Sequence, residues 1–160
     1  MCIFLFSSIY IKLLFNQVPA LQINEMILPQ SKSIERFLSK QFGLLGNGIL
    51  EEAQIDAINE GVEDLFNKYR PIRYLSDKDE KVQKFQALQS DVLPVWLANF
   101  EKILGNNKQN GVLFGKTISL ADLNLFYLIE NFFEEKFENF LDKFPLISSH
   151  FKEIQTILKR

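Results

Sequence analysis

The sequence predicts a mostly helical α+β protein in which two strands and one helix precede an all-helical domain. Three observations support this fold class. Short apolar runs flank a polar pair within residues 18–29, a glycine-rich stretch "GLLGNGI" covers residues 43–49, and apolar residues recur every three or four positions from residue 51 onward. We therefore predict two domains, at residues 1–45 and 49–160.

Composition narrows the class of protein. Of the 160 residues, 47% are hydrophobic and 24% are charged, which is the balance of a globular protein. A net charge of -2 gives no electrostatic reason to expect a nucleic-acid partner. Cys2 and His150 are the only residues of their types, so we expect neither a disulfide framework nor a metal site. A reducing, cytoplasmic setting is the expected location.

The first fifteen residues, "MCIFLFSSIYIKLLF", are strongly apolar. A membrane-spanning helix needs about 20 such residues, and Lys12 interrupts this run. The basic stretch that opens a secretory signal is missing. We expect a strand-like leader and no membrane partner. The alternatives are a targeting or membrane-surface segment and a mis-assigned start of the gene.

The first predicted elements are a strand pair. One run extends from Val18 to Ile23 and the next from Met26 to Leu28, with Asn24 and Glu25 between them as a two-residue turn. Pro29 ends the second run. The pattern indicates an antiparallel hairpin.

A helix is predicted next, with Ser31 or Ser33 as its cap. Gly43 is expected to end it, because glycine readily adopts the left-handed conformation that follows many helices. Four apolar residues fall on one face of this helix at helical spacing: Ile34, Phe37, Leu38 and Phe42.

Two long helices are predicted after the glycine-rich stretch. The first begins near Glu51 and ends before Pro71. The second extends from about Lys78 to Leu104, and Pro94 inside it predicts a kink. Trp96 and the phenylalanines are expected in the core.

The stretch "TISLADLNLF" gives the clearest local signal of the helical domain. Ser119 and Asp122 have the spacing of a capping box, so we assign them a structural role as a helix cap. The helix behind them is apolar on nearly all sides and is expected at the centre of the domain. Two shorter helices are predicted around residues 134–142 and from Leu146 to Leu158, with His150 on the surface.

Three features occur together in this sequence: Val18-Pro19, then Gln30-Ser31, then an all-helical domain that contains the capped "SLADL" helix. Together they resemble the glutathione S-transferases. The resemblance begins near Leu14. Within the family, the sequence is most similar to the sigma class, and the alpha class is an alternative label. It implies a partial thioredoxin-like domain over residues 1–45, in which residues 1–13 are an atypical leader. The family's all-α C-terminal domain would follow.

The resemblance also implies a glutathione site. The Val18–Pro19 peptide would be cis, and the backbone of Val18 would pair with the cysteinyl unit of glutathione. Gln30 and Ser31, at a helix N-terminus, would hold the γ-glutamyl carboxylate. Asp64 from the other subunit of a homodimer would meet the γ-glutamyl amino group. Glutathione is then a co-substrate, and no further cofactor is implied.

The resemblance matches no residue of this sequence to the family's catalytic tyrosine, so no catalytic residue is predicted. The βαβ unit that carries it takes ~30 residues or more, whereas only residues 1–17 precede Val18, which indicates an N-terminal truncation. The leader is hypothesised to supply a substitute strand.

The leading interpretation is a glutathione transferase that conjugates glutathione to hydrophobic electrophiles in detoxification. The alternatives are a non-catalytic module for binding or dimerisation, and the truncated product of a gene model or pseudogene.

Overall fold

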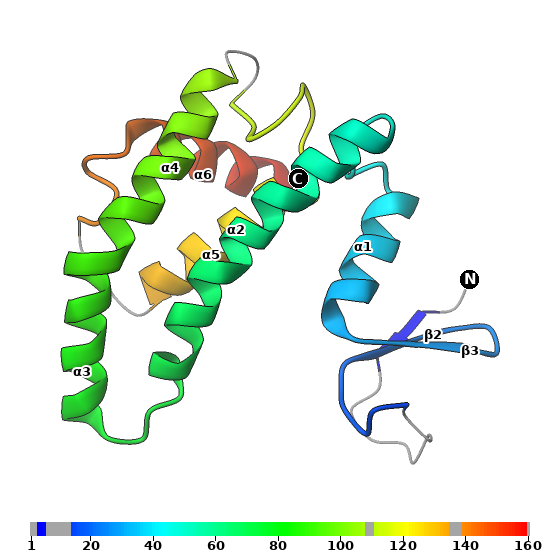
Figure 1. The fold of residues 1–160 in the computed structure, drawn as a ribbon, viewed down its shortest axis with the longest axis horizontal. Helices are drawn as coiled ribbons and strands as arrows, with labels where there is room; N and C mark the ends of the chain where they lie inside the picture. The colour runs from blue at the N-terminus through cyan, green and yellow to red at the C-terminus, as the bar shows by residue number, and fades with distance from the viewer. Residues whose placement is uncertain (1–2, 6–13, 108–110, 135–138, 160) are drawn as a thin grey trace. The chain divides into compact units, whose positions relative to one another are not determined.

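The computed structural model describes residues 3–5, 14–107, 111–134 and 139–159 (Figure 1). The chain divides into two compact units, Met1–Leu45 and Gly46–Arg160. The boundary falls inside the glycine-rich stretch, where few side chains are available to build a shared core. No helix in the described part of the chain is long and apolar enough to cross a lipid bilayer.

The first unit contains a three-stranded antiparallel sheet in the order β1 (Ile3–Leu5), β2 (Ala20–Ile23) and β3 (Met26–Pro29). β2 and β3 form the predicted hairpin, in which Ile23 stands opposite Met26. The turn at Asn24 and Glu25 is also as predicted. Asn24 has a φ of 55°, and asparagine tolerates this left-handed conformation better than most residues.

The other edge of β2 is covered by β1. The two strands pair antiparallel, with Leu5 opposite Leu21. The leader therefore supplies a strand at Ile3–Leu5, as predicted, and its role as a substitute for a missing strand stays a prediction. The rest of the leader, at residues 1–2 and 6–13, lies outside the described residues.

Helix α1 (Ser31–Gln41) follows β3 directly and packs on β2 and β3. The prediction that Ser31 or Ser33 caps it is wrong, because Gln30 is the N-cap residue and Ser31 already has helical geometry. β3 runs to Pro29, so only Gln30 is left to turn the chain, which it does at a φ of 74°. Gly43, at a φ of 70°, ends the helix as predicted.

The second unit is all helical (Figure 1). α5 packs against α2 and α6, and α4 also packs against α6, so α5 takes the predicted central position. Its residues Leu125, Leu128 and Ile129 are completely buried. The elements of this unit are α2 (Ile49–Arg73), α3 (Lys78–Ala87), the π-helical turn η1 (Leu88–Val92), α4 (Leu93–Asn106), α5 (Leu120–Glu134) and α6 (Pro145–Leu158).

Two prolines affect their helices differently from what the sequence predicted. α2 does not end before Pro71 but contains it and continues to Arg73. In the last turn the missing N–H of proline removes only one hydrogen bond, so the helix tolerates it. The break expected at Pro94 occurs one turn earlier, as η1, and Pro94 lies in the first turn of α4. Proline and π turns are both features at which helices typically kink.

Two further predictions need correction. The short helix expected around residues 134–142 is not found where the chain is described, since α5 ends at Glu134 and turns begin at Asn139. Asn139 has a φ of 58°, which a right-handed helix cannot contain. Trp96, expected in the core, is only half-buried, and Phe42 is exposed.

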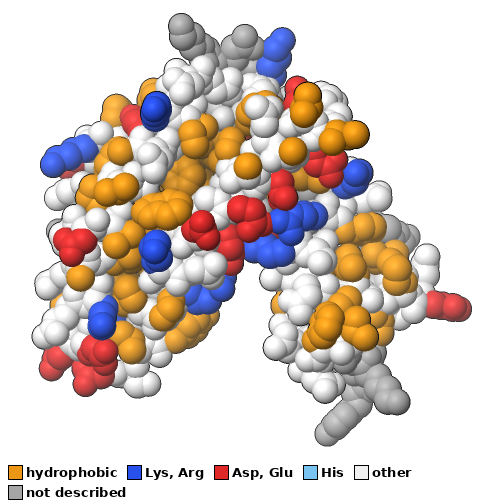
Figure 2. Space-filling view, viewed as in Figure 1, with side chains coloured by type: hydrophobic (Ala, Val, Ile, Leu, Met, Phe, Trp, Pro, Cys, Tyr) orange, Lys and Arg blue, Asp and Glu red, His pale blue; other side chains and the backbone are white. Residues whose placement is uncertain are grey.

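Charged side chains of both signs are interspersed over the face seen in Figure 2, with hydrophobic side chains between them.

Candidate functional site

The first part of the candidate site is the peptide bond between Val18 and Pro19, which is cis, as the resemblance implied. Val18 is 67% exposed. It precedes the first residue of β2, and neither of the described strand ladders includes it. Its backbone groups are thus placed at the end of a strand and outside the sheet's own pairing.

The second part is the N-terminus of α1, where Gln30 and Ser31 are both exposed. The first helical bond runs from the Ile34 N–H to the Gln30 carbonyl at 3.0 Å. Gln30 makes no side-chain cap bond, and the first turn holds no acidic residue. The N–H groups of this turn and the positive end of the helix dipole therefore suit an anion.

The hairpin brings these two parts together. Ala20 pairs with Pro29, and the turn that joins the strands lies at the opposite end. Val18 and Pro19 come just before Ala20, and Gln30 and Ser31 come just after Pro29. All four residues therefore lie at the open end of the β2–β3 hairpin.

Asp64 belongs to the second unit and is exposed on α2. Its neighbour Glu63 accepts a hydrogen bond from Arg70 at 3.1 Å. The role of Asp64 in a second copy of the chain stays a prediction.

Ser119 and Asp122 form a buried cap at the start of α5. The Asp122 carboxylate accepts the backbone N–H of Ser119 at 2.8 Å and its hydroxyl at 2.6 Å. It also accepts the N–H of Leu113 at 2.7 Å, which ties the preceding loop to the helix. Ser119 is 2% exposed and Asp122 0%, so both have the structural place that the sequence predicted.

His150 was expected on the surface, and this is wrong, because it is 1% exposed. Its Nδ1 lies 2.7 Å from the Gly111 carbonyl, and its Nε2 lies 3.7 Å from Asp122 Oδ1. Since a carbonyl only accepts, Nδ1 must carry a proton. The helical spacing of His150 with Ile147 and Ile154, both buried, is the sequence signal that could have placed it inside.

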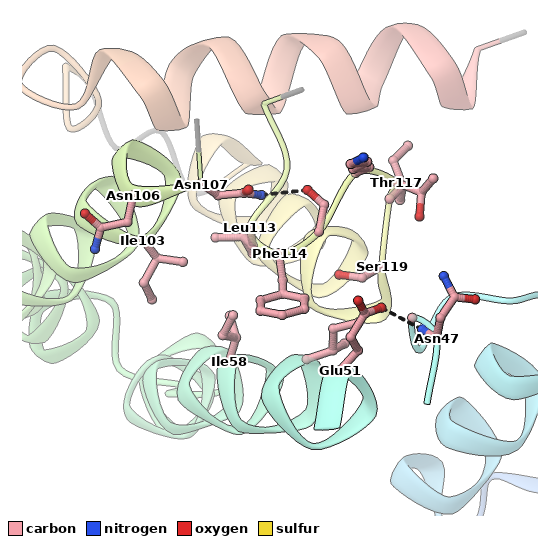
Figure 3. A pocket seen from close by; sticks show the side chains of 15 residues that line it. Asn47, Glu51, Ile58, Ile103, Asn106, Asn107, Leu113, Phe114, Thr117 and Ser119 are labelled. Atoms are coloured by element: carbon pink, nitrogen blue, oxygen red, sulfur yellow. Dashed lines mark hydrogen bonds between the residues drawn. The ribbon is translucent and has the colours of Figure 1, made fainter. Parts of the chain in front are cut away.

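A cleft of about 850 Å³ in the second unit was missed by sequence reasoning. Its walls are the start of α2, the end of α4 and the loop that leads to α5 (Figure 3). Phe114 of the loop and Ile58 of α2 point toward each other across it. Apolar residues at Phe114 and Ile118, inside a glycine-containing loop, were the only signal. Among the described residues no group of three or more His, Cys, Asp or Glu side chains could hold a metal ion.

Comparison with known proteins gives a consistent result. Residues 63–159 match the family model described as the C-terminal domain of glutathione S-transferases. A glutathione S-transferase of Plasmodium yoelii yoelii is 38% identical over 89% of this chain and 65% of its own length. The human glutathione S-transferase P is 36% identical over 90% of this chain and 66% of its own length.

Among solved structures, the pi-class glutathione S-transferase of Onchocerca volvulus is similar. It superposes with a TM-score of 0.74 at 33% identity, over 86% of this chain and 64% of that one. The chain thus spans slightly less than two thirds of the length of several curated relatives, for example 65% and 64% of the two Plasmodium proteins.

Proposed function

The chain belongs to the glutathione S-transferase family, and we propose that it binds reduced glutathione at the open end of the β2–β3 hairpin. The observation that carries the proposal is the juxtaposition there of a cis Val18–Pro19 peptide with the N-terminus of α1. The cis peptide offers backbone groups that can pair as a strand does, and the N-terminus of α1 attracts a carboxylate.

The chemistry of glutathione matches both features. Its γ-glutamyl carboxylate would accept N–H groups at Gln30 and Ser31, where the helix dipole favours negative charge. Its cysteinyl unit would pair with the backbone of Val18, as an added strand does. The positively charged amino group of the γ-glutamyl unit needs an acidic partner, which in our proposal is Asp64 of a second copy in a homodimer.

The class within the family is also a proposal. The sequence resembles the sigma class, with alpha as an alternative label. Several relatives carry a class in their names, and those cited here are of type P or pi. We therefore favour a pi-like assignment over the sigma-like one. A cytoplasmic location stays a prediction.

Family membership supports conjugation of glutathione to hydrophobic electrophiles. In that reaction the thiolate sulfur forms a new bond to carbon, and the leaving group departs with its electron pair. A second candidate is binding without conjugation. It is favoured by the absence of tyrosine from the described residues of the first unit, 3–5 and 14–45, so the hydroxyl that would favour the thiolate is not among them.

Calorimetric titration with reduced glutathione tests the binding site. Ser31→Asp should stabilise α1, because a negative charge suits a helix N-terminus, yet it should weaken glutathione binding at least tenfold by repelling the carboxylate. Gln41→Asp adds the same charge at the other end of α1 and serves as the control, with affinity unchanged.

The outcomes separate the two candidates. Glutathione binding with turnover of an aryl chloride, followed by absorbance, supports a transferase. Binding without turnover supports the second candidate. If the wild-type chain does not bind glutathione, or if Ser31→Asp binds it as well as the wild type, the proposed site is wrong.

A further inference from the structure

Asn47 and Gly48 stand in the glycine-rich stretch, directly before α2. Both residues are exposed, and Gly48 is the N-cap residue of the helix. Gly48 has a φ of 92°, a conformation that residues with a side chain rarely adopt. The residue after Asn47 is thus glycine for a backbone reason, and its nitrogen has no Cβ beside it to hinder an approaching group.

The main chain is fixed on both sides of the Asn47–Gly48 peptide. Glu51 Oε2 accepts the Asn47 N–H at 2.7 Å (Figure 3). The same oxygen lies close over Gly46, where an added Cβ would come within 2.8 Å of it. The Gly48 carbonyl accepts the Glu52 N–H at 3.0 Å. The peptide between these anchors therefore keeps its place at the start of α2.

The Asn47 side-chain amide and the Gly48 N–H are both free to react. Neither group makes a hydrogen bond to the described residues. The amide can therefore rotate onto the Gly48 nitrogen without breaking a bond to the protein. Because the two groups belong to adjacent residues, their reaction is intramolecular and gains from proximity.

We propose that Asn47 is a site of spontaneous modification, at which the Gly48 nitrogen attacks the carbonyl carbon of the Asn47 side chain. A bond between this nitrogen and this carbon forms and closes a succinimide ring. The side-chain nitrogen leaves as ammonia and takes the Gly48 proton with it. Water then opens the ring at either of its carbonyls. One opening gives aspartate, and the other gives isoaspartate, in which the main chain passes through the former side chain.

The modification changes the start of α2 in charge and in length. Either product replaces a neutral amide with a carboxylate, so the net charge of the chain becomes more negative by one. The new charge lies near the positive end of the helix dipole, but also beside Glu51 and Glu52 of the first turn. Isoaspartate also adds a methylene group to the main chain, within the glycine-rich stretch that joins the two units.

Two exposed asparagines serve as internal comparisons. Asn24 lies in the β2–β3 turn, but it is followed by Glu25. Asn67 lies inside α2, where the N–H of the next residue is held by the helix. A second asparagine–glycine pair begins at Asn110, which lies outside the described residues. The reaction therefore has to be counted residue by residue.

Peptide mapping of the whole chain, kept for several weeks at neutral pH, tests the proposal. Trypsin releases residues 41–68 as one peptide, which carries Asn47 and Asn67 together. Mass-spectrometric fragmentation assigns the mass gain of an amide converted to an acid to one of them. We expect Asn47 to lose its amide at least tenfold faster than Asn67 and Asn24. Freshly prepared chain, digested in parallel, measures any reaction during the digestion itself.

Two substitutions separate the parts of the reaction. Gly48→Ala keeps Asn47 but places a Cβ beside the attacking nitrogen, so the loss of the amide should slow at least tenfold. The added Cβ meets no other atom within 4 Å. Asn47→Gln has a longer side chain that closes a ring less readily, and it should keep its amide. Gly61→Ala is the matched control, because it makes the same change elsewhere in the 41–68 peptide and should leave the rate at Asn47 unchanged.

A protein isoaspartyl methyltransferase, supplied with S-adenosylmethionine, identifies the isoaspartate product. It should label the 41–68 peptide of the aged wild type, and not that of the fresh chain or of aged Asn47→Gln. Equal rates at Asn47 and Asn67, an unchanged rate in Gly48→Ala, or no label on the aged peptide would each overturn the proposal. These assays contain no glutathione, so failure here leaves the glutathione site untouched.

Discussion

His150 shows at the scale of one residue how a polar side chain can belong in a core. Its ring is buried, and Nδ1 donates to the Gly111 carbonyl at 2.7 Å. This bond joins α6 to the loop that precedes α5. Gly111 itself is exposed, so its carbonyl can turn to water, and loss of the bond should cost only the net value of a hydrogen bond, ~0.5–1.5 kcal/mol.

A pair of substitutions at His150 isolates this bond. Asparagine and leucine have nearly the same shape, and only asparagine has an N–H in about the position of Nδ1. We expect His150→Asn to have a free energy of unfolding about 1 kcal/mol above that of His150→Leu, measured by urea denaturation. If the leucine variant is equally stable or more stable, the bond to Gly111 contributes little and the site is held by packing alone.

The sequence predicted some residues of the site better than others. Ser119 and Asp122 were found because a cap depends on side chains three positions apart. His150 was missed, because its partner Gly111 is 39 residues away and no local pattern encodes such a contact. The places of Val18 and Ser31 were implied by the family resemblance, and neither spacing nor composition would have shown them.

At the scale of elements, α6 begins with a cap supplied by another helix. Glu101 of α4 accepts the N–H groups of Leu146 at 2.8 Å and Ile147 at 2.9 Å, one with each carboxylate oxygen. Its negative charge also suits the positive end of α6. The start of this helix near Leu146 was predicted from sequence, but its cap Glu101 was not, since it precedes Leu146 by 45 residues.

Removal of this carboxylate should destabilise the second unit. We expect Glu101→Ala to lower the free energy of unfolding by about 1–2 kcal/mol, as the loss of a good N-cap does. Lys102→Ala is the control, because Lys102 is the next residue of α4 and is exposed. Urea denaturation of both variants checks the prediction, which fails if the two lose the same stability.

The elements themselves were mostly predictable, and the errors have local causes. The hairpin, α1, the central α5 and α6 were predicted from periodicity and turn residues. The end of α2 was placed too early, because proline in a last turn costs only one hydrogen bond. The π turn before Pro94 was predicted only as a kink, since periodicity does not say which residues absorb the break.

At the scale of the whole molecule, the proposed glutathione site joins Ser31 in one copy of the chain to Asp64 in another. In a dimer with two-fold symmetry, each subunit supplies the same residue to its partner's site, so Asp64 of each chain would complete the site of the other. The prediction that depends on this arrangement is complementation between two defective chains. It rests on the proposed function and on the existence of a dimer.

Subunit mixing tests it directly. Ser31→Asp and Asp64→Ala chains should each bind glutathione at least tenfold more weakly than the wild type. If Asp64 acts across the dimer, a mixed dimer has one intact site, formed by Ser31 of the Asp64→Ala chain and Asp64 of the Ser31→Asp chain. After unfolding and joint refolding in equal amounts, random pairing should restore about a quarter of the sites, counted by calorimetry. If Asp64 serves its own chain, no mixed dimer has an intact site, and the mixture binds no better than its components.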